Sequence, residues 1–197
     1  MEQEINSLAD LHKIVTDLNN NYNNGIGKQV CGLHIGEVSG RPPEHIIEST
    51  IRNVKTKNMG YTPTRGNTEL IDLICNDLRH RKHFSINNQQ VIITNGSKQG
   101  LFYAINILID KGDEVIIHTP YWNSYQKLVE MRGGILKTLP LENNGNLNLQ
   151  VLGNMITDKT KMIIICSPHN PTGTIPDIDN MKKIADLIKD TNIVILA

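Results

Sequence analysis

The stretch from Cys166 to Gly173 places an amide side chain, two prolines and a glycine directly after a short apolar run. That run, Met162–Ile165, is typical of a buried parallel strand. Asn170 and Pro171 favour a turn, and Gly173 permits backbone conformations that other residues avoid. Ligands of open α/β sheets bind at the carboxyl ends of the strands. We therefore expect the Asn170 amide to be a ligand-binding group.

A candidate anion site lies within Val91–Gly100, which reads as a strand, a turn of small residues and the start of a helix. The backbone amides of Ser97, Lys98 and Gln99 would lack partners within the helix and point towards one spot. The Ser97 hydroxyl adds another donor. The spacing matches neither Gly-x-x-x-x-Gly-Lys nor Gly-x-Gly-x-x-Gly, the two common nucleotide-binding patterns. An ordinary strand-to-helix turn is the alternative interpretation.

Trp122 is the only tryptophan in a chain with 4% aromatic residues, and it follows the predicted strand Glu114–His118. An indole at the carboxyl end of a strand offers a flat apolar face on which a heteroaromatic ring can stack. The alternative is that Trp122 packs in the core or at an interface.

These motifs together resemble the class I and II aminotransferases, pyridoxal-phosphate-dependent enzymes of fold type I. The string from Ser167 to Gly173 is similar to the Asn-Pro-x-x-Pro-Thr-Gly loop of that family. The string from Pro120 to Tyr125 is similar to Pro-Tyr-Trp-x-Ser-Tyr of the bacterial aspartate and prephenate aminotransferases. The resemblance covers the chain from about Leu33 to its end.

The resemblance implies pyridoxal 5'-phosphate as cofactor and assigns its contacts. Ser97, Lys98 and Gln99 would hold the phosphate, Trp122 would cover the pyridine ring, and Asn170 would hydrogen-bond the 3'-oxygen. Trp122 and Asn170 would also line the substrate site. The implied activity is transfer of an amino group between an amino acid and a 2-oxo acid.

Two further residues receive roles from the resemblance. Gly36 matches the glycine beside the substrate carboxylate, although the family more often continues Gly-Glu-Pro where this chain has Val38. Tyr61, five residues before Gly66, matches a tyrosine that reaches across a dimer interface to the partner's cofactor phosphate. The implied assembly is a homodimer.

The Schiff-base lysine and the aspartate that pairs with the pyridinium nitrogen have no match before Ala197. We therefore expect the chain to be the amino-terminal half of an aminotransferase, inactive alone, and we assign no catalytic residue within it. The alternatives are a pyridoxal-dependent carbon–sulfur lyase of the same fold and a non-catalytic remnant or binding module.

The order of elements predicts an α/β fold, a mostly parallel sheet with helices on both faces, incomplete at the carboxyl terminus. We expect residues 1–40 to form a helix and an arm leading to the substrate loop, and 41–197 to begin the cofactor-binding large domain. Predicted helices span Ile5–Leu18, Glu44–Lys57, Leu70–Leu78, Ser97–Ile109, Ser124–Met131, Leu147–Ile156 and Ile178–Lys189. Predicted strands span Leu33–Ile35, Val91–Thr94, Glu114–His118, Ile135–Leu139, Met162–Ile165 and Ile193–Leu196.

Composition argues against several other classes. The 20 basic and 20 acidic residues cancel, so no net field favours nucleic acid or an anionic membrane. The basic cluster Arg79–His83 is better explained as the end of a helix. No apolar stretch approaches the roughly 20 residues of a membrane span. With no visible signal peptide and three scattered cysteines, we expect a cytoplasmic protein without a metal site.

Overall fold

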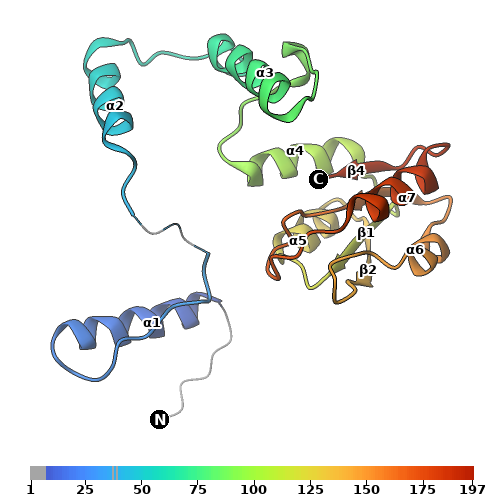
Figure 1. Cartoon of the computed structure of the whole chain (residues 1–197), viewed down its shortest axis with the longest axis horizontal. Coiled ribbons are helices and arrows are strands. Elements are labelled where there is room, and N and C mark those ends of the chain that lie inside the picture. Colours follow the sequence, from blue (N-terminus) through green and yellow to red (C-terminus); the bar gives the residue numbers. More distant parts are fainter. Residues whose placement is uncertain (1–7, 37, 39) are drawn as a thin grey trace. The chain divides into compact units, whose positions relative to one another are not determined.

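Four parallel strands form the centre of the C-terminal part of the computed structural model, which describes residues 8–36, 38 and 40–197 (Figure 1). The strands are β1 Glu114–Thr119, β2 Ile135–Pro140, β3 Thr160–Ile164 and β4 Val194–Leu196. Their order in the sheet is β2-β1-β3-β4, and each neighbouring pair is parallel. The predicted parallel α/β sheet is therefore confirmed.

Seven α-helices and one 3₁₀ turn are found among the described residues. They are α1 Leu8–Asn23, α2 Glu44–Thr56, α3 Thr68–Lys82, η1 Asn88–Gln90, α4 Ser97–Leu108, α5 Ser124–Met131, α6 Leu149–Met155 and α7 Ile178–Ile188. Helix α3 ends in the predicted basic cluster, and His83 closes it in the left-handed conformation at φ 53°.

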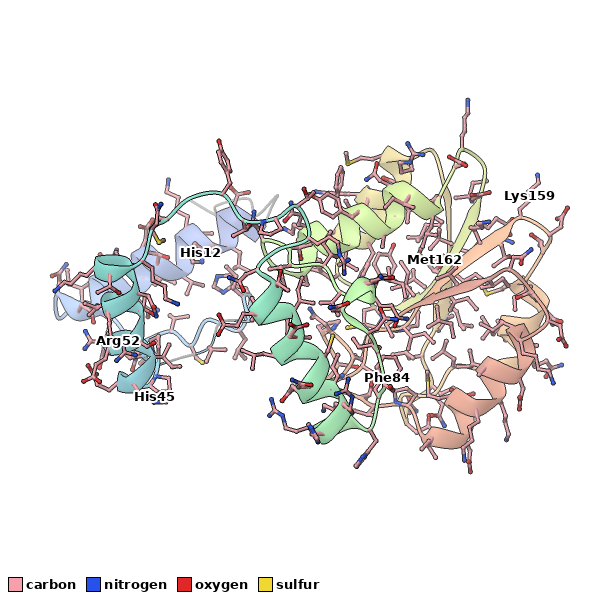
Figure 2. All side chains as sticks on the ribbon, turned by 90° about the horizontal axis from the view of Figure 1, so that it is seen from above. His12, His45, Arg52, Phe84, Lys159 and Met162 are labelled. Carbon is pink, nitrogen blue, oxygen red and sulfur yellow. The ribbon has the colours of Figure 1, made fainter. Side chains whose placement is uncertain are left out.

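The sheet separates two apolar cores, and β1 contributes to both. Ile116 packs with residues of α6 and α7 on one face. Val115 and Ile117 pack with residues of α4 and α5 on the other. Successive side chains of a strand point to opposite faces, so the continuous apolar run of β1 fills both cores. Figure 2 shows α4 and α7 on opposite sides of the strands, with the labelled Met162 among them.

The chain divides into two units, Met1–Tyr61 and Thr62–Ala197. The first, the N-terminal unit, contains α1 and α2. Within it the Asn19 side chain accepts from the Val30 amide at 2.9 Å and donates to the Val30 carbonyl at 3.1 Å. The second, the C-terminal unit, contains the sheet and the remaining helices.

Two predicted strands were wrong, and helices α1 and α3 run past their predicted ends at Leu18 and Leu78, to Asn23 and Lys82. Val91–Thr94 is extended but pairs with no strand. It makes one backbone hydrogen bond to the preceding loop, from the Ile93 amide to the Arg65 carbonyl. Leu33–Ile35 likewise lacks a described ladder partner. Helix α1 continues through the asparagine run to Asn23, where the local backbone bonds outweigh the low helix propensity of asparagine. The predicted start of that helix at residues 5–7 lies outside the described residues.

Candidate active site

The candidate site lies at the carboxyl ends of β1 and β3, beside the amino terminus of α4. Helix α4 begins at Ser97, and its N-cap residue Gly96 makes no side-chain cap. The exposed amides of Ser97 and Lys98 are therefore left for a ligand or water. The Gln99 side chain is engaged locally: its Oε1 accepts from the Asn95 amide at 2.6 Å. Gln99 thus braces the turn, and its backbone amide is the group that remains for a ligand.

Trp122 lies next to this helix terminus. The Lys98 Nζ atom is 4.9 Å from the centroid of the Trp122 ring, a cation–π contact. Tyr125, the second residue of α5, meets the same indole edge-on, with ring centroids 5.8 Å apart and an interplanar angle of 89°. Trp122 is half-buried, so part of its surface stays open.

Tyr125 also links Trp122 to the loop that follows β3. Burial, together with the neighbouring Cys166 thiol, raises the pKa of the Tyr125 hydroxyl above its usual value. Cys166 begins the loop that carries Asn170. Trp122 and the Asn170 loop are therefore joined through one tyrosine, which brings the three motifs predicted from the sequence to one edge of the sheet.

Asn170 is exposed, and its amide has no hydrogen-bond partner in the described part of the chain. The residues after it form a closed turn. The Gly173 amide donates to the His169 carbonyl at 2.7 Å, and the His169 amide donates to the Thr174 carbonyl at 2.8 Å. Gly173 has φ 72°, so the conformational freedom expected of this glycine is used. The turn holds Asn170 at the surface with its amide free.

Two groups at this edge received no role from sequence reasoning. Tyr125 belongs to the same motif as Trp122, and its position three residues further on, across the turn that opens α5, is the signal that could have found it. His118 ends the apolar run of β1 and is 2% exposed. A polar residue at the carboxyl end of a central strand was the available signal. Its Nε2 accepts from the Cys166 amide at 3.1 Å.

The remaining predicted residues belong to the N-terminal unit. Gly36 is exposed, and no atom lies within 4 Å of where a Cβ would stand. The Tyr61 ring is fully exposed. Each residue is accessible, and the role expected of each stays a prediction.

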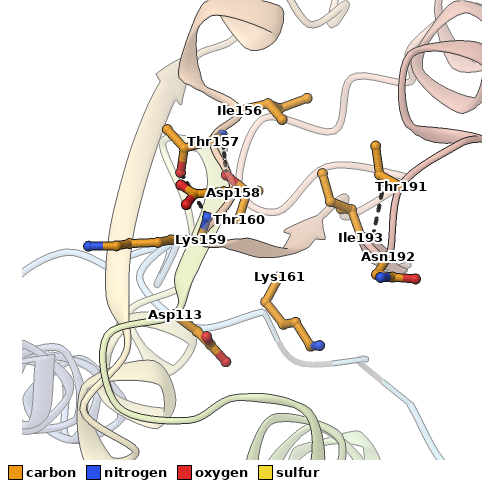
Figure 3. Close-up of a pocket in the computed structure, with 10 residues that line it drawn as sticks. All are labelled: Asp113, Ile156, Thr157, Asp158, Lys159, Thr160, Lys161, Thr191, Asn192 and Ile193. Carbon is orange, nitrogen blue, oxygen red and sulfur yellow. Dashed lines mark hydrogen bonds between the residues drawn. The ribbon is translucent and has the colours of Figure 1, made fainter.

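A pocket of about 340 Å³ lies at the opposite, amino-terminal edge of the sheet (Figure 3). Two of its backbone donors are bonded within the lining: the Thr157 amide donates to Thr160 Oγ1 at 2.9 Å, and the Ile193 amide donates to Thr191 Oγ1 at 3.2 Å. These two donors are therefore not available to a ligand, and no residue predicted from the sequence to bind a ligand lines this pocket. In the described residues no helix is long and apolar enough to cross a membrane. The same residues contain no cluster of three or more His, Cys, Asp or Glu side chains suited to a metal ion.

Comparison with known proteins agrees with this geometry. Residues 28–197 match the family model described as aminotransferase class I and II. The chain is 37% identical over 165 residues to the probable aspartate aminotransferase of Methanocaldococcus jannaschii, covering 84% of this chain and 44% of that protein. It is 33% identical over 174 residues to the aspartate aminotransferase of Bacillus subtilis, covering 87% and 44% respectively.

A solved structure gives the same result. The aspartate aminotransferase of Thermotoga maritima superposes with a TM-score of 0.86 at 30% identity, covering 98% of this chain and 50% of that one. The fold is that of the pyridoxal-phosphate-dependent enzymes of fold type I. The chain belongs to the class I and II aminotransferases, and it spans about half the length of the relatives it matches.

Proposed function

We propose that this chain supplies the phosphate, ring and 3'-oxygen contacts of a pyridoxal 5'-phosphate site. The whole protein would transfer an amino group between an amino acid and a 2-oxo acid. Members of the class I and II family use pyridoxal phosphate, which supports the proposal. The observation that carries this proposal is the contact between Lys98 and Trp122, because this contact sets a cation and uncapped helix amides beside an aromatic face.

The residues present fit that cofactor. Its phosphate is an anion, and the α4 terminus offers unpaired amides, the Ser97 hydroxyl and the positive end of the helix dipole. Its ring is flat and heteroaromatic, and the half-buried Trp122 indole offers a face of the same kind. Its 3'-oxygen is an acceptor, and the unpartnered Asn170 amide is a donor.

Each residue then has one physical task. The α4 amides neutralise and anchor the phosphate, Trp122 stacks on the ring and excludes water from it, and Asn170 favours the deprotonated form of the 3'-oxygen. When bound, the cofactor supplies an electron-withdrawing ring that stabilises negative charge at the α-carbon of an amino acid.

The proposed substrate follows from the relatives. The proteins of M. jannaschii and B. subtilis are named aspartate aminotransferases, so we propose aspartate as the amino donor of the whole protein. Gly36 would leave space for its carboxylate. Tyr61 would serve the cofactor of a second subunit in a homodimer, and its full exposure supports that role. Residues 1–40 would form the arm that carries the substrate loop.

Titration of the 197-residue chain with pyridoxamine 5'-phosphate tests the cofactor site. This ligand keeps the ring, 3'-oxygen and phosphate but has no aldehyde to react with surface lysines. Trp122 is the sole tryptophan, so its fluorescence reports on the site directly. We expect saturable quenching of the tryptophan fluorescence. Pyridoxamine, which lacks the phosphate, should bind at least about tenfold more weakly.

A matched pair of variants locates the phosphate. Ser97→Asp sets a carboxylate at the α4 terminus and should abolish quenching through repulsion between like charges. Ser85→Asp adds the same charge at another exposed position and should leave binding unchanged. Equal binding by both variants would refute the proposed phosphate site.

Turnover is a separate measurement. We expect the 197 residues alone to bind the cofactor without converting aspartate and 2-oxoglutarate, because no lysine in them matches the one that carries the cofactor. A protein that also supplies that lysine should convert them. Conversion by the 197-residue chain would contradict this assignment.

A further inference from the structure

Two histidines beneath the candidate site are buried and incompletely hydrogen-bonded. His118 is 2% exposed and His169 is 4% exposed. Their ring centroids are 4.4 Å apart, with an interplanar angle of 62°. In the described chain His118 Nδ1 and His169 Nε2 have no hydrogen-bond partner. Burying polar atoms without partners costs free energy, so apolar packing alone does not account for this pair.

The pair is connected to the loop of Asn170 on both sides. His118 Nε2 accepts from the Cys166 amide at 3.1 Å, at the first residue of the loop. His169 Nδ1 lies 2.6 Å from Thr172 Oγ1, beyond Asn170 in the same turn. The two contacts flank Asn170, so the position of its amide depends on both rings.

We propose that His118 is a positioning residue for Asn170: its neutral ring, packed edge-on against His169, fixes the Cys166 backbone and thereby sets where the Asn170 amide stands. The consequence for cofactor binding rests on the function proposed above, whereas the bracing of the loop does not. His118 lies below the loop and acts through it.

The brace requires an uncharged His118. Its Nε2 accepts the Cys166 hydrogen bond only while that nitrogen carries no proton. Burial and the neighbouring His169 lower the pKa of His118 from 6.5 to about 4, so the accepting form predominates near neutral pH. The small cavity beside the pair is also lined by Leu141, Gly145, Leu147, Ile165, Cys166 and Pro176, and of these only Cys166 can titrate. Tyr125 faces Cys166 from α5.

Hydrogen exchange of residues 166–174 tests the brace without any ligand. His118→Leu removes the acceptor, and His118→Gln restores an amide oxygen that can accept and stays neutral. Near neutral pH we expect exchange in this segment to rise about five- to tenfold in His118→Leu and to return close to wild type in His118→Gln. Circular dichroism tests whether each variant is folded. If His118→Leu is unfolded, the test uses the comparison of His118→Gln with the wild type across pH instead.

The pH profile separates positioning from packing. After correction for intrinsic exchange rates, loop exchange in the wild type should rise as the pH falls from 6.5 towards about 4, and the rise in His118→Gln, which keeps His169, should be smaller. His80→Gln, a change at an exposed histidine of α3, should follow the wild type. Loop exchange that is equal in wild type, His118→Gln and folded His118→Leu, with one common pH profile, would overturn the proposal.

Pyridoxamine 5'-phosphate binding then distinguishes the bracing of the loop by His118 from the proposed cofactor site. His118→Leu should bind about fivefold more weakly than wild type, with His118→Gln within about twofold. If loop exchange responds as expected but the wild type does not bind the ligand, the brace stands and the cofactor site fails. If the wild type binds but loop exchange is insensitive to His118, the brace fails and the cofactor site stands.

Discussion

Asn180 and Leu147 are joined by two hydrogen bonds that imitate the pairing of two strands. The Leu147 amide donates to Asn180 Oδ1 at 3.1 Å, and Asn180 Nδ2 donates to the Leu147 carbonyl at 2.9 Å. Asn180 lies in the first turn of α7, and Leu147 is a core residue just before α6. One amide side chain therefore satisfies both backbone groups of a buried residue and ties the two helices of this face together.

Asn180→Ala should lower the free energy of unfolding by about 2–4 kcal/mol, because it leaves a buried amide and a buried carbonyl without partners. Urea unfolding followed by circular dichroism measures the change. Asp186→Ala, at an exposed position of the same helix, should change the stability by less than about 0.5 kcal/mol. Similar effects of the two substitutions would show that water replaces the Asn180 amide at no cost.

Gly66→Ala should destabilise the fold by about 2–4 kcal/mol. Gly66 has φ 106°, and a Cβ there would overlap the Ile93 side chain, so both backbone strain and overlap oppose the new methyl group. Gly60→Ala is the matched control, because no atom lies within 4 Å of its Cβ position. Thermal unfolding of the two variants gives the comparison, and a Gly66→Ala chain as stable as Gly60→Ala would contradict the close packing of this loop.

Trp122→Ala should weaken pyridoxamine 5'-phosphate binding by about 1–2 kcal/mol, or roughly 5- to 30-fold, the scale of lost ring stacking and lost burial. Calorimetry measures the affinity, since this variant has no tryptophan to report it. Tyr22→Ala removes an exposed aromatic ring from α1 and should bind as the wild type does. Unchanged affinity after Trp122→Ala would make this indole a packing residue.

Stability should fall on acidification because of His118. Its pKa is about 4 in the folded chain and 6.5 as the ordinary value, so between these limits the unfolded chain binds a proton that the folded chain excludes. The stabilisation due to its neutral form is complete above pH 6.5 and is lost as the pH falls towards 4, by about 2–4 kcal/mol in total. Urea unfolding at several pH values should show that acidification lowers the free energy of unfolding less in His118→Gln than in His80→Gln. If the free energy of unfolding fell equally with pH in both variants, the contribution of His118 to the pH dependence would be refuted.

The sequence was informative where a pattern is local. The periodicity of Ser124–Met131 and the apolar run of β1 predicted their elements, because burial of one helix face or of a whole strand leaves a pattern in neighbouring residues. The Asn170 loop was predictable for the same reason: its turn is closed by bonds between residues only a few positions apart.

Long-range pairing was not predictable in this way. Val91–Thr94 has the composition of a strand, but a strand also needs a neighbour, and sequence pattern does not say whether one is present. The contact between His118 and His169 joins residues from β1 and from the loop after β3, and it depends on these two strands being adjacent in the sheet. That adjacency is a property of the fold, which is why neither histidine received a role.

The double burial of β1 also limits how this sequence can evolve. Ile116 belongs to one core, and its neighbours Val115 and Ile117 belong to the other. Gain or loss of one codon within Glu114–Thr119 would exchange the two sets of side chains and disturb both cores at once, whereas a substitution disturbs only one. Insertions and deletions among descendants of this chain should therefore collect in exposed connecting segments such as 142–144, while β1 changes by substitution alone.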